Sequence, residues 1–179
     1  MVVRDIPRCI DTLNNLFPGE KPFRAEYSGA WHPNESGDDD PILRLGATGG
    51  IYFYSEPGNP EWNLNINENG NSIWYIGKSS ASVRSRVWKN LGNLYESDGS
   101  LCNPRFRHHR WMNDSSITDA RVKNNIANGD FVAYGIDIVP QESRFDPEII
   151  ETFLLCCYYR SMGKLPVLNS IISQYKVPR

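Results

Sequence analysis

Two short aromatic segments, residues 50–54 and 74–78, constrain the fold of this 179-residue chain more than any other feature. Both combine tyrosine with aromatic or β-branched neighbours, and the stretch between them is rich in Asn, Gly and Pro, which is typical of strands joined by turns. The second segment runs directly into residues 79–88, whose pattern predicts a helix that carries Arg84 and Arg86. Two neighbouring strands followed at once by an arginine-bearing helix therefore organise the chain.

The two strands are predicted to gather tyrosines on one face. Alternate side chains of a strand share a face, so Tyr52 and Tyr54 are expected to point the same way. If the strands pair as antiparallel neighbours, Tyr75 joins Tyr52 on that surface. The opposite set, expected to face the core, is Ile51, Phe53, Trp74 and Ile76.

Periodicity and capping residues predict the remaining elements. The N-terminal part is predicted to hold a helix within residues 1–20 and irregular chain over 21–42, with the first tyrosine strand starting near Leu43. A helix is then expected from an N-cap at Ser79 or Ser80 to Gly92, and another over 116–127, capped by Ser116 and Asp119. The C-terminal part is predicted to hold a strand over 131–139 and a helix from the N-cap Asp146 to Met162. They predict an α/β fold: a small three-stranded, mainly antiparallel sheet flanked by helices, with an N-terminal helical extension. The excursion over 55–71 is long enough to hold a ribbon of its own.

The helix over 146–162 is apolar around most of its circumference and is expected to be largely buried. Glu151 lies inside this apolar run. Burying an unpaired carboxylate costs several kcal/mol, so Glu151 is expected to face a cation or strong hydrogen-bond donors. Glu148 has a simpler explanation, because an acidic residue in the first turn complements the helix dipole.

The charge distribution is uneven. The formal net charge is −2, which taken alone argues against a nucleic-acid partner. Residues 78–110, however, hold seven basic and two acidic residues, a net charge of +5, and the rest of the chain then carries −7. Such a basic segment attracts phosphate; the alternative is chance clustering on a solvated face. Its basic and histidine residues are Lys78, Arg84, Arg86, Lys89, Arg105, Arg107, His108, His109 and Arg110.

Size and cysteine usage narrow the class of protein. A chain of this length with 40% hydrophobic residues suits one compact domain. The four cysteines lack paired metal spacing, and Cys102 with His108 and His109 fits no common zinc site. Without a membrane-length apolar stretch or a secretory signal, a reduced cytoplasmic protein without membrane contact is expected.

The order Gly50-Ile51-Tyr52, then Tyr75-Ile76-Gly77, then an arginine on the following helix resembles the GIY-YIG nuclease family. Both triplets match letter for letter and in order. The resemblance spans about residues 50–169. It implies a single GIY-YIG nuclease domain over 1–179, with the catalytic core at about 43–170 and an N-terminal extension over 1–42.

The resemblance implies two catalytic tyrosines and one arginine. Tyr52 and Tyr75 match the family's tyrosines directly. Arg86 matches the arginine because Val87 follows it, as an aliphatic residue usually does in the family, and Arg84 is the alternative.

The resemblance also implies a glutamate, an asparagine and a histidine at the site. Glu151 matches the family's glutamate, which would also be the metal ligand, and Asn169 matches its closing asparagine. The histidine that many members carry one turn after the arginine is replaced by Asn90, and Lys78, His108 or His109 would have to substitute for it.

These residue types suit phosphodiester hydrolysis. A carboxylate holding one Mg²⁺ or Mn²⁺ supplies Lewis-acid help, and arginine pairs with phosphate oxygens in bidentate fashion. A cation beside Tyr52 should lower the pKa of the phenol and allow it to act as general base, with Tyr75 orienting water or phosphate.

The resemblance implies an endonuclease that hydrolyses double-stranded DNA and leaves 5′-phosphate and 3′-hydroxyl ends. A chain of this size favours a sequence-specific restriction-type enzyme, since the family's homing enzymes append a separate DNA-binding region and its repair members are longer. A homodimer would place one active site on each strand of a palindrome. The alternatives are a structure-selective repair or phage-defence nuclease and a catalytically silent nucleic-acid-binding module.

Overall fold

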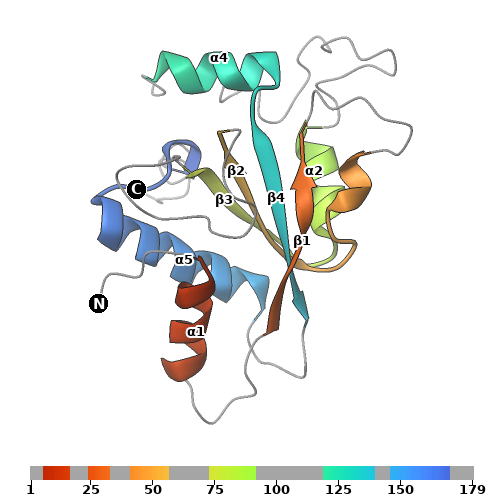
Figure 1. Ribbon diagram of the computed structural model, residues 1–179. Coiled ribbons are helices and arrows are strands. Elements are labelled where there is room, and N and C mark those ends of the chain that lie inside the picture. The colour runs from red at the N-terminus through yellow and green to blue at the C-terminus, as the bar shows by residue number, and fades with distance from the viewer. Residues whose placement is uncertain are drawn as a thin grey trace, which may run out of the picture.

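The computed structural model describes residues 6–16, 24–32, 41–56, 73–91, 119–139 and 146–169. At its centre is a four-stranded sheet in the order β1-β4-β2-β3, in which every neighbouring pair is antiparallel (Figure 1). The strands are β1 (Arg24–Trp31), β2 (Gly50–Ser55), β3 (Ile73–Ser79) and β4 (Val132–Val139). The helices are α1 (Ile6–Leu16), the 3-10 turn η1 (Pro41–Arg44), α2 (Val83–Leu91), α4 (Ala120–Asn128) and α5 (Pro147–Met162).

The α/β class and the antiparallel pairing of the two tyrosine strands are confirmed, but the three-strand count is wrong. The fourth strand, β1, lies within residues 21–42, which were predicted to be irregular. It pairs with β4 and is interrupted by a bulge at Ser28. Gly29 follows with φ of +153°, and a Cβ there would lie 2.1 Å from the carbonyl oxygen of Arg44. This polar, glycine-containing segment becomes a strand because β4 offers it an edge, which its own pattern does not reveal.

The first tyrosine strand also begins later than predicted. Leu43 belongs to η1, and β2 starts at Gly50. A Cβ at Gly50 would lie 2.0 Å from the carbonyl oxygen of Ile136 in β4. The glycine therefore permits the close approach of the two strand backbones.

The sheet separates two hydrophobic clusters. The α5 face, which also packs against α1, contains Ile51, Phe53, Ile73 and Ile76. The α2 face, which also packs against η1, contains Tyr52, Tyr54, Tyr75 and Trp74. The predicted alternation along β2 is confirmed, but Trp74 lies on the face opposite to the one predicted. A bulge explains this, because Tyr54 pairs with Tyr75 and Ser55 with Ile73, which leaves Trp74 as the extra residue.

Local caps fix the helix ends. Ser82, rather than Ser79 or Ser80, caps α2: its hydroxyl oxygen accepts a hydrogen bond from the backbone N–H of Ser85 at 3.1 Å. Asp119 caps α4, whose left-handed Gly129 ends the helix as predicted. The predicted capping partner Ser116 lies outside the described residues.

The helix α5 begins at the predicted cap Asp146 and ends at Met162. It is not largely buried, however. Its buried residues are Ile150, Leu154, Cys157 and Tyr158, which make up one face only. None of the helices in the described part of the chain is long and apolar enough to cross a membrane.

Candidate functional site

Three tyrosines from β2 and β3 form the centre of the candidate site. In the strand register Tyr52 lies opposite Gly77, and Tyr54 lies opposite Tyr75. The ring centroids are 5.7 Å apart for Tyr52 and Tyr75, and 5.4 Å apart for Tyr54 and Tyr75. The structure therefore brings together Tyr52 and Tyr75, the tyrosines of the two triplets. They do not form an open surface, because Tyr52 is 1% exposed and Tyr75 is 7% exposed.

Gly77 makes room for both rings. A Cβ at this position would lie 2.4 Å from Cε1 of Tyr75 and 2.5 Å from Cζ of Tyr52. Side-chain atoms do not approach this closely, so both rings would have to move. The glycine of the second triplet is thus required by the packing of the tyrosines.

Arg86 on α2 is bound to the tyrosine cluster. Burial disfavours its charged form, but a hydrogen bond with Tyr52 and the charges of Tyr52, Tyr75 and Tyr54 outweigh this, so the pKa of the guanidinium is raised. Arg84 behaves differently: its Nε donates to the carbonyl of Leu45 and its NH2 to that of Leu43, each at 2.9 Å. Arg84 therefore ties α2 to η1, and Arg86 is the arginine at the site.

The surroundings of Tyr75 favour its protonated form. The pKa of Tyr75 is raised, first by burial, then by the charge of Tyr52 and a hydrogen bond with it, and then by the charge of Glu151; Arg86 opposes the shift. Because Tyr75 keeps its proton, it can act as a donor to the hydroxyl oxygen of Tyr52.

Glu151 reaches the site from the other side of the sheet. The edge strand β3 packs against α5 on one face of the sheet and against α2 on the other. Glu151 is close enough for its charge to raise the pKa of Tyr75. It is half-buried rather than buried as predicted, because it lies at the border of the buried face of α5.

One partly exposed carboxylate fits a magnesium-type ion. Such ions keep several waters and bind through one or two carboxylates together with substrate phosphates. Within the described ranges, no three His, Cys, Asp or Glu side chains cluster to form an all-protein metal cage. Glu151 is thus suited to a metal site that is completed by substrate.

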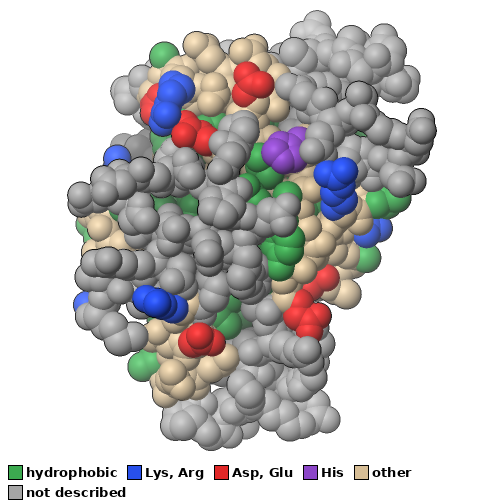
Figure 2. Space-filling model, viewed as in Figure 1, with side chains coloured by type: hydrophobic (Ala, Val, Ile, Leu, Met, Phe, Trp, Pro, Cys, Tyr) green, Lys and Arg blue, Asp and Glu red, His purple; other side chains and the backbone are tan. Residues whose placement is uncertain are grey.

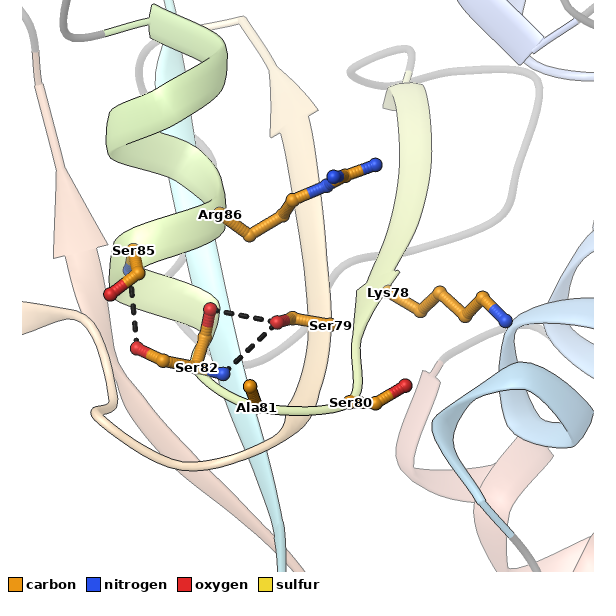
Figure 3. A pocket seen from close by; sticks show the side chains of 7 residues that line it. All are labelled: Lys78, Ser79, Ser80, Ala81, Ser82, Ser85 and Arg86. Atoms are coloured by element: carbon orange, nitrogen blue, oxygen red, sulfur yellow. Dashed lines mark hydrogen bonds between the residues drawn. The ribbon is translucent and has the colours of Figure 1, made fainter.

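A pocket of about 380 Å³ opens between β3 and α2 (Figure 3). Arg86 extends from α2 on one side, and Lys78 extends from the end of β3 toward α5 on the other. Lys78 Nζ lies 2.6 Å from Oε2 of Glu148, so the first turn of α5 holds this lysine. The serines and alanine that complete the wall are Ser79, Ser80, Ala81, Ser82 and Ser85.

Hydrogen bonds fix the loop that forms the floor of the pocket. The Ser79 hydroxyl donates to the carbonyl of Ser82 at 2.8 Å and accepts from its N–H at 3.0 Å (Figure 3). The first amides of α2 are already in use, since the N–H groups of Val83 and Arg84 donate to Thr48 and Gly46 at 2.9 Å. An anion in the pocket would therefore meet the side chains of Lys78 and Arg86 rather than free helix amides.

Asn169 holds the outer edge of β3. Its Nδ2 donates to the carbonyl of Ile76 and its Oδ1 accepts from the N–H of the same residue, both at 2.8 Å. The side chain is buried and replaces a missing neighbouring strand at the position between Tyr75 and Gly77. Because both ends of the amide are used by the backbone, Asn169 positions the tyrosine strand.

The predicted DNA-binding residues are described only in part. Lys89 lies on α2, but its side chain, like the segment that contains Arg105, Arg107, His108, His109 and Arg110, lies outside the described residues. On the face seen in Figure 2, described acidic and basic side chains are interspersed, without a continuous basic patch among them.

Sequence reasoning missed two features of the site: the serine-lined pocket and the pairing of Lys78 with Glu148. The serine run was interpreted only as a source of N-caps, and Glu148 only as a partner of the helix dipole. The proximity of Lys78 to α5 depends on the packing of distant segments, so the residues around Lys78 in the sequence do not predict it.

Comparison of the sequence with protein-family models and with curated proteins, and of the fold with solved structures, finds no match. The GIY-YIG resemblance therefore rests on the two triplets and on the residues described above. The site itself combines a tyrosine pair, a guanidinium bound to it, a carboxylate beside it and a two-cation pocket at its entrance.

Proposed function

We infer that this chain is a divalent-metal-dependent endonuclease of the GIY-YIG type that hydrolyses double-stranded DNA to 5′-phosphate and 3′-hydroxyl ends. The observation that carries the proposal is the position of Arg86, which lines the pocket and is hydrogen-bonded to Tyr52. A phosphate bound by Arg86 would lie next to a tyrosine hydroxyl. Glu151, whose charge raises the pKa of Tyr75, supplies the carboxylate that such chemistry needs.

Binding of the phosphate uses the two cations of the pocket. Arg86 offers a planar guanidinium that pairs with two phosphate oxygens, and Lys78 offers a compact charge. Glu148, in the first turn of α5, holds the ammonium of Lys78 at 2.6 Å. The scissile phosphate is thereby held between α2 and the first turn of α5.

The proton of the attacking water is assigned to Tyr52. Tyr75 and Arg86 both keep their protons because their pKa values are raised, and each shares a hydrogen bond with Tyr52. Hydrogen bonds donated by these two groups would favour a phenolate at Tyr52 during the reaction. The water oxygen bonds to phosphorus, the bond to the 3′ oxygen breaks, and that oxygen takes a proton from solvent. A Mg²⁺ or Mn²⁺ held by Glu151 would supply charge neutralisation on the phosphate when bound.

The decisive experiment is incubation of plasmid DNA with the full chain in Mg²⁺ or Mn²⁺. Glu151→Gln is expected to reduce cleavage by at least about 10²-fold while DNA binding is retained, as is typical of losing a group that acts in the chemical step. The matched control is Asp11→Asn, an exposed acid on α1, which should cleave like the unaltered chain. Equal activity of the two variants would contradict the role of Glu151.

The digestion pattern separates the narrower alternatives. Discrete fragments support a restriction-type enzyme, whereas a smear or cleavage of branched DNA alone supports a structure-selective repair or defence nuclease. An unaltered chain that binds DNA but cuts none in any divalent metal would instead be a nucleic-acid-binding module.

A further inference from the structure

The outer side of α5 carries a stripe of four exposed residues. Its ends are large and apolar: Ile149 is 42% exposed and Tyr159 is 55% exposed. Thr152 and Cys156 lie between them and are also exposed. Spacings of three, four and three residues place all four on one side of the helix. The residues that α5 buries against the rest of the fold lie on its opposite side, so the stripe faces away from the sheet and from the tyrosine cluster.

The stripe is more apolar than its composition suggests. The hydroxyl of Thr152 donates to the carbonyl of Glu148 at 2.9 Å, within its own helix. Its hydrogen bond is therefore already made, and its methyl group is available for packing. Ile149, the methyl group of Thr152, Cys156 and Tyr159 therefore form a row of apolar groups along one side of the helix.

The stripe is symmetric about Leu154. An antiparallel copy of α5 centred there would place Ile149 opposite Tyr159 and Thr152 opposite Cys156. The same alignment sets the first-turn acid Glu148, whose Oε2 is also paired with Lys78, opposite the last-turn base Arg160, and both side chains are exposed. The helix dipoles would also run in opposite directions, which is favourable. A second copy of this helix matches the stripe in shape and in charge.

We propose that this stripe is the contact surface of a homodimer in which α5 packs antiparallel against α5 of a second copy. The contact is isologous, because each side presents the same patch and a two-fold axis relates the two chains. The balanced charge of the stripe does not suit DNA, which selects a positive surface. One helix pair falls at the small end of specific interfaces, roughly 1,200 Å² in total or less, so the dimer is expected at high micromolar protein concentration.

Sedimentation equilibrium of the full chain tests the proposal. The unaltered protein, with a chain mass of 20.4 kDa, is expected to approach twice that mass as concentration rises. Tyr159→Glu should remain monomeric because it places two acids in the contact without disturbing a buried residue. Leu16→Glu on α1, where the side chain is 60% exposed, is the matched control and should dimerise normally. A monomer at every concentration, or equal behaviour of the two variants, would overturn the proposal.

A cross-link tests the register independently. Thr152→Cys places a new thiol opposite Cys156 of the second copy, and mild oxidation by diamide, which takes up the two protons and two electrons, should give a reducible dimer on denaturing gels. The same substitution together with Cys156→Ser should give little dimer, because the two introduced thiols lie about one turn apart along the axis. Equal cross-linking in both backgrounds would refute this register. Both readouts are independent of whether the chain cleaves DNA.

Discussion

The two faces of the sheet differ in the side chains that pack against them. The α5 face is built mainly from aliphatic residues of the strands and of α1 and α5. The α2 face holds three tyrosines and a tryptophan, together with the buried Ser28 Oγ, which makes no hydrogen bond, and the carboxylate of Asp137, of which the buried Oδ1 makes none. Burying polar oxygens costs free energy. The α5 face therefore contributes mainly stability, and the α2 face retains polar groups at the expense of stability.

Among the substitutions that test this difference between the two faces, Leu154→Ala on the α5 face is expected to reduce stability most. Leu154 is fully buried, so its truncation leaves a cavity and should lower the free energy of unfolding by about 2–5 kcal/mol. Tyr54→Phe on the α2 face keeps the ring and should cost less than about 1.5 kcal/mol. Urea unfolding of both variants measures the contrast, and comparable losses would show that the two faces are not specialised.

A smaller loss of stability, but a larger functional one, is expected from Gly77→Ala. The added methyl group would collide with Tyr52 and Tyr75, so overpacking should cost about 1–3 kcal/mol. Displacing the phenols should also lower plasmid cleavage by at least about 10²-fold. Gly163→Ala is the control for activity, since a Cβ there meets nothing within 4 Å, although its left-handed conformation costs some stability. A Gly77→Ala variant with full activity would mean that the positions of the two rings do not matter.

The smallest effect is expected from Asp137→Asn. Burial raises the pKa of Asp137 above its ordinary value of 3.8; a hydrogen bond with Thr48 and the charge of Arg84 oppose the shift, and Glu26 adds to it. The folded state therefore binds this proton more tightly than the unfolded state, and the charged form lowers stability above the raised pKa. The amide should stabilise the fold at pH 7 by less than about 1 kcal/mol, because solvent screens the group in part.

The pH dependence identifies the cause of that gain. The stability advantage of the Asp137→Asn variant over the unaltered protein should shrink as the pH falls through the raised pKa and vanish below 3.8. Thermal unfolding of both proteins between about pH 3 and pH 8 measures it. A difference that does not change with pH would assign the effect to packing instead of charge.

Local sequence signals account for much of the fold. The alternation in β2, the cap Asp146 and the stop at Gly129 each depend on a few neighbouring residues, and each appears in the structure as predicted. The strand β1 was missed because Ser28 and Gly29 interrupt its pattern, and β4 supplies the pairing that makes it a strand. The position of Trp74 was missed because a bulge depends on the partner strand.

In the candidate site, too, some features follow from local sequence and others depend on distant segments. The pairing of Tyr52 with Tyr75 follows from strand periodicity, and the choice of Arg86 over Arg84 agrees with the hydrogen bonds of each arginine. The half-exposed position of Glu151, the bonding of Asn169 to Ile76 and the pairing of Lys78 with Glu148 were not predictable. Each depends on how α5 and the chain that follows it meet the edge strand β3.

The sequence by itself determined which residues lie on each face of the first tyrosine strand and where most helices stop, because backbone geometry and capping act over a few residues. The tertiary structure decided which side chains meet, because burial, edge pairing and bulges depend on segments far apart in the chain. Asn169 illustrates the difference: its amide satisfies a backbone position 93 residues away, and only the folded sheet leaves that position open.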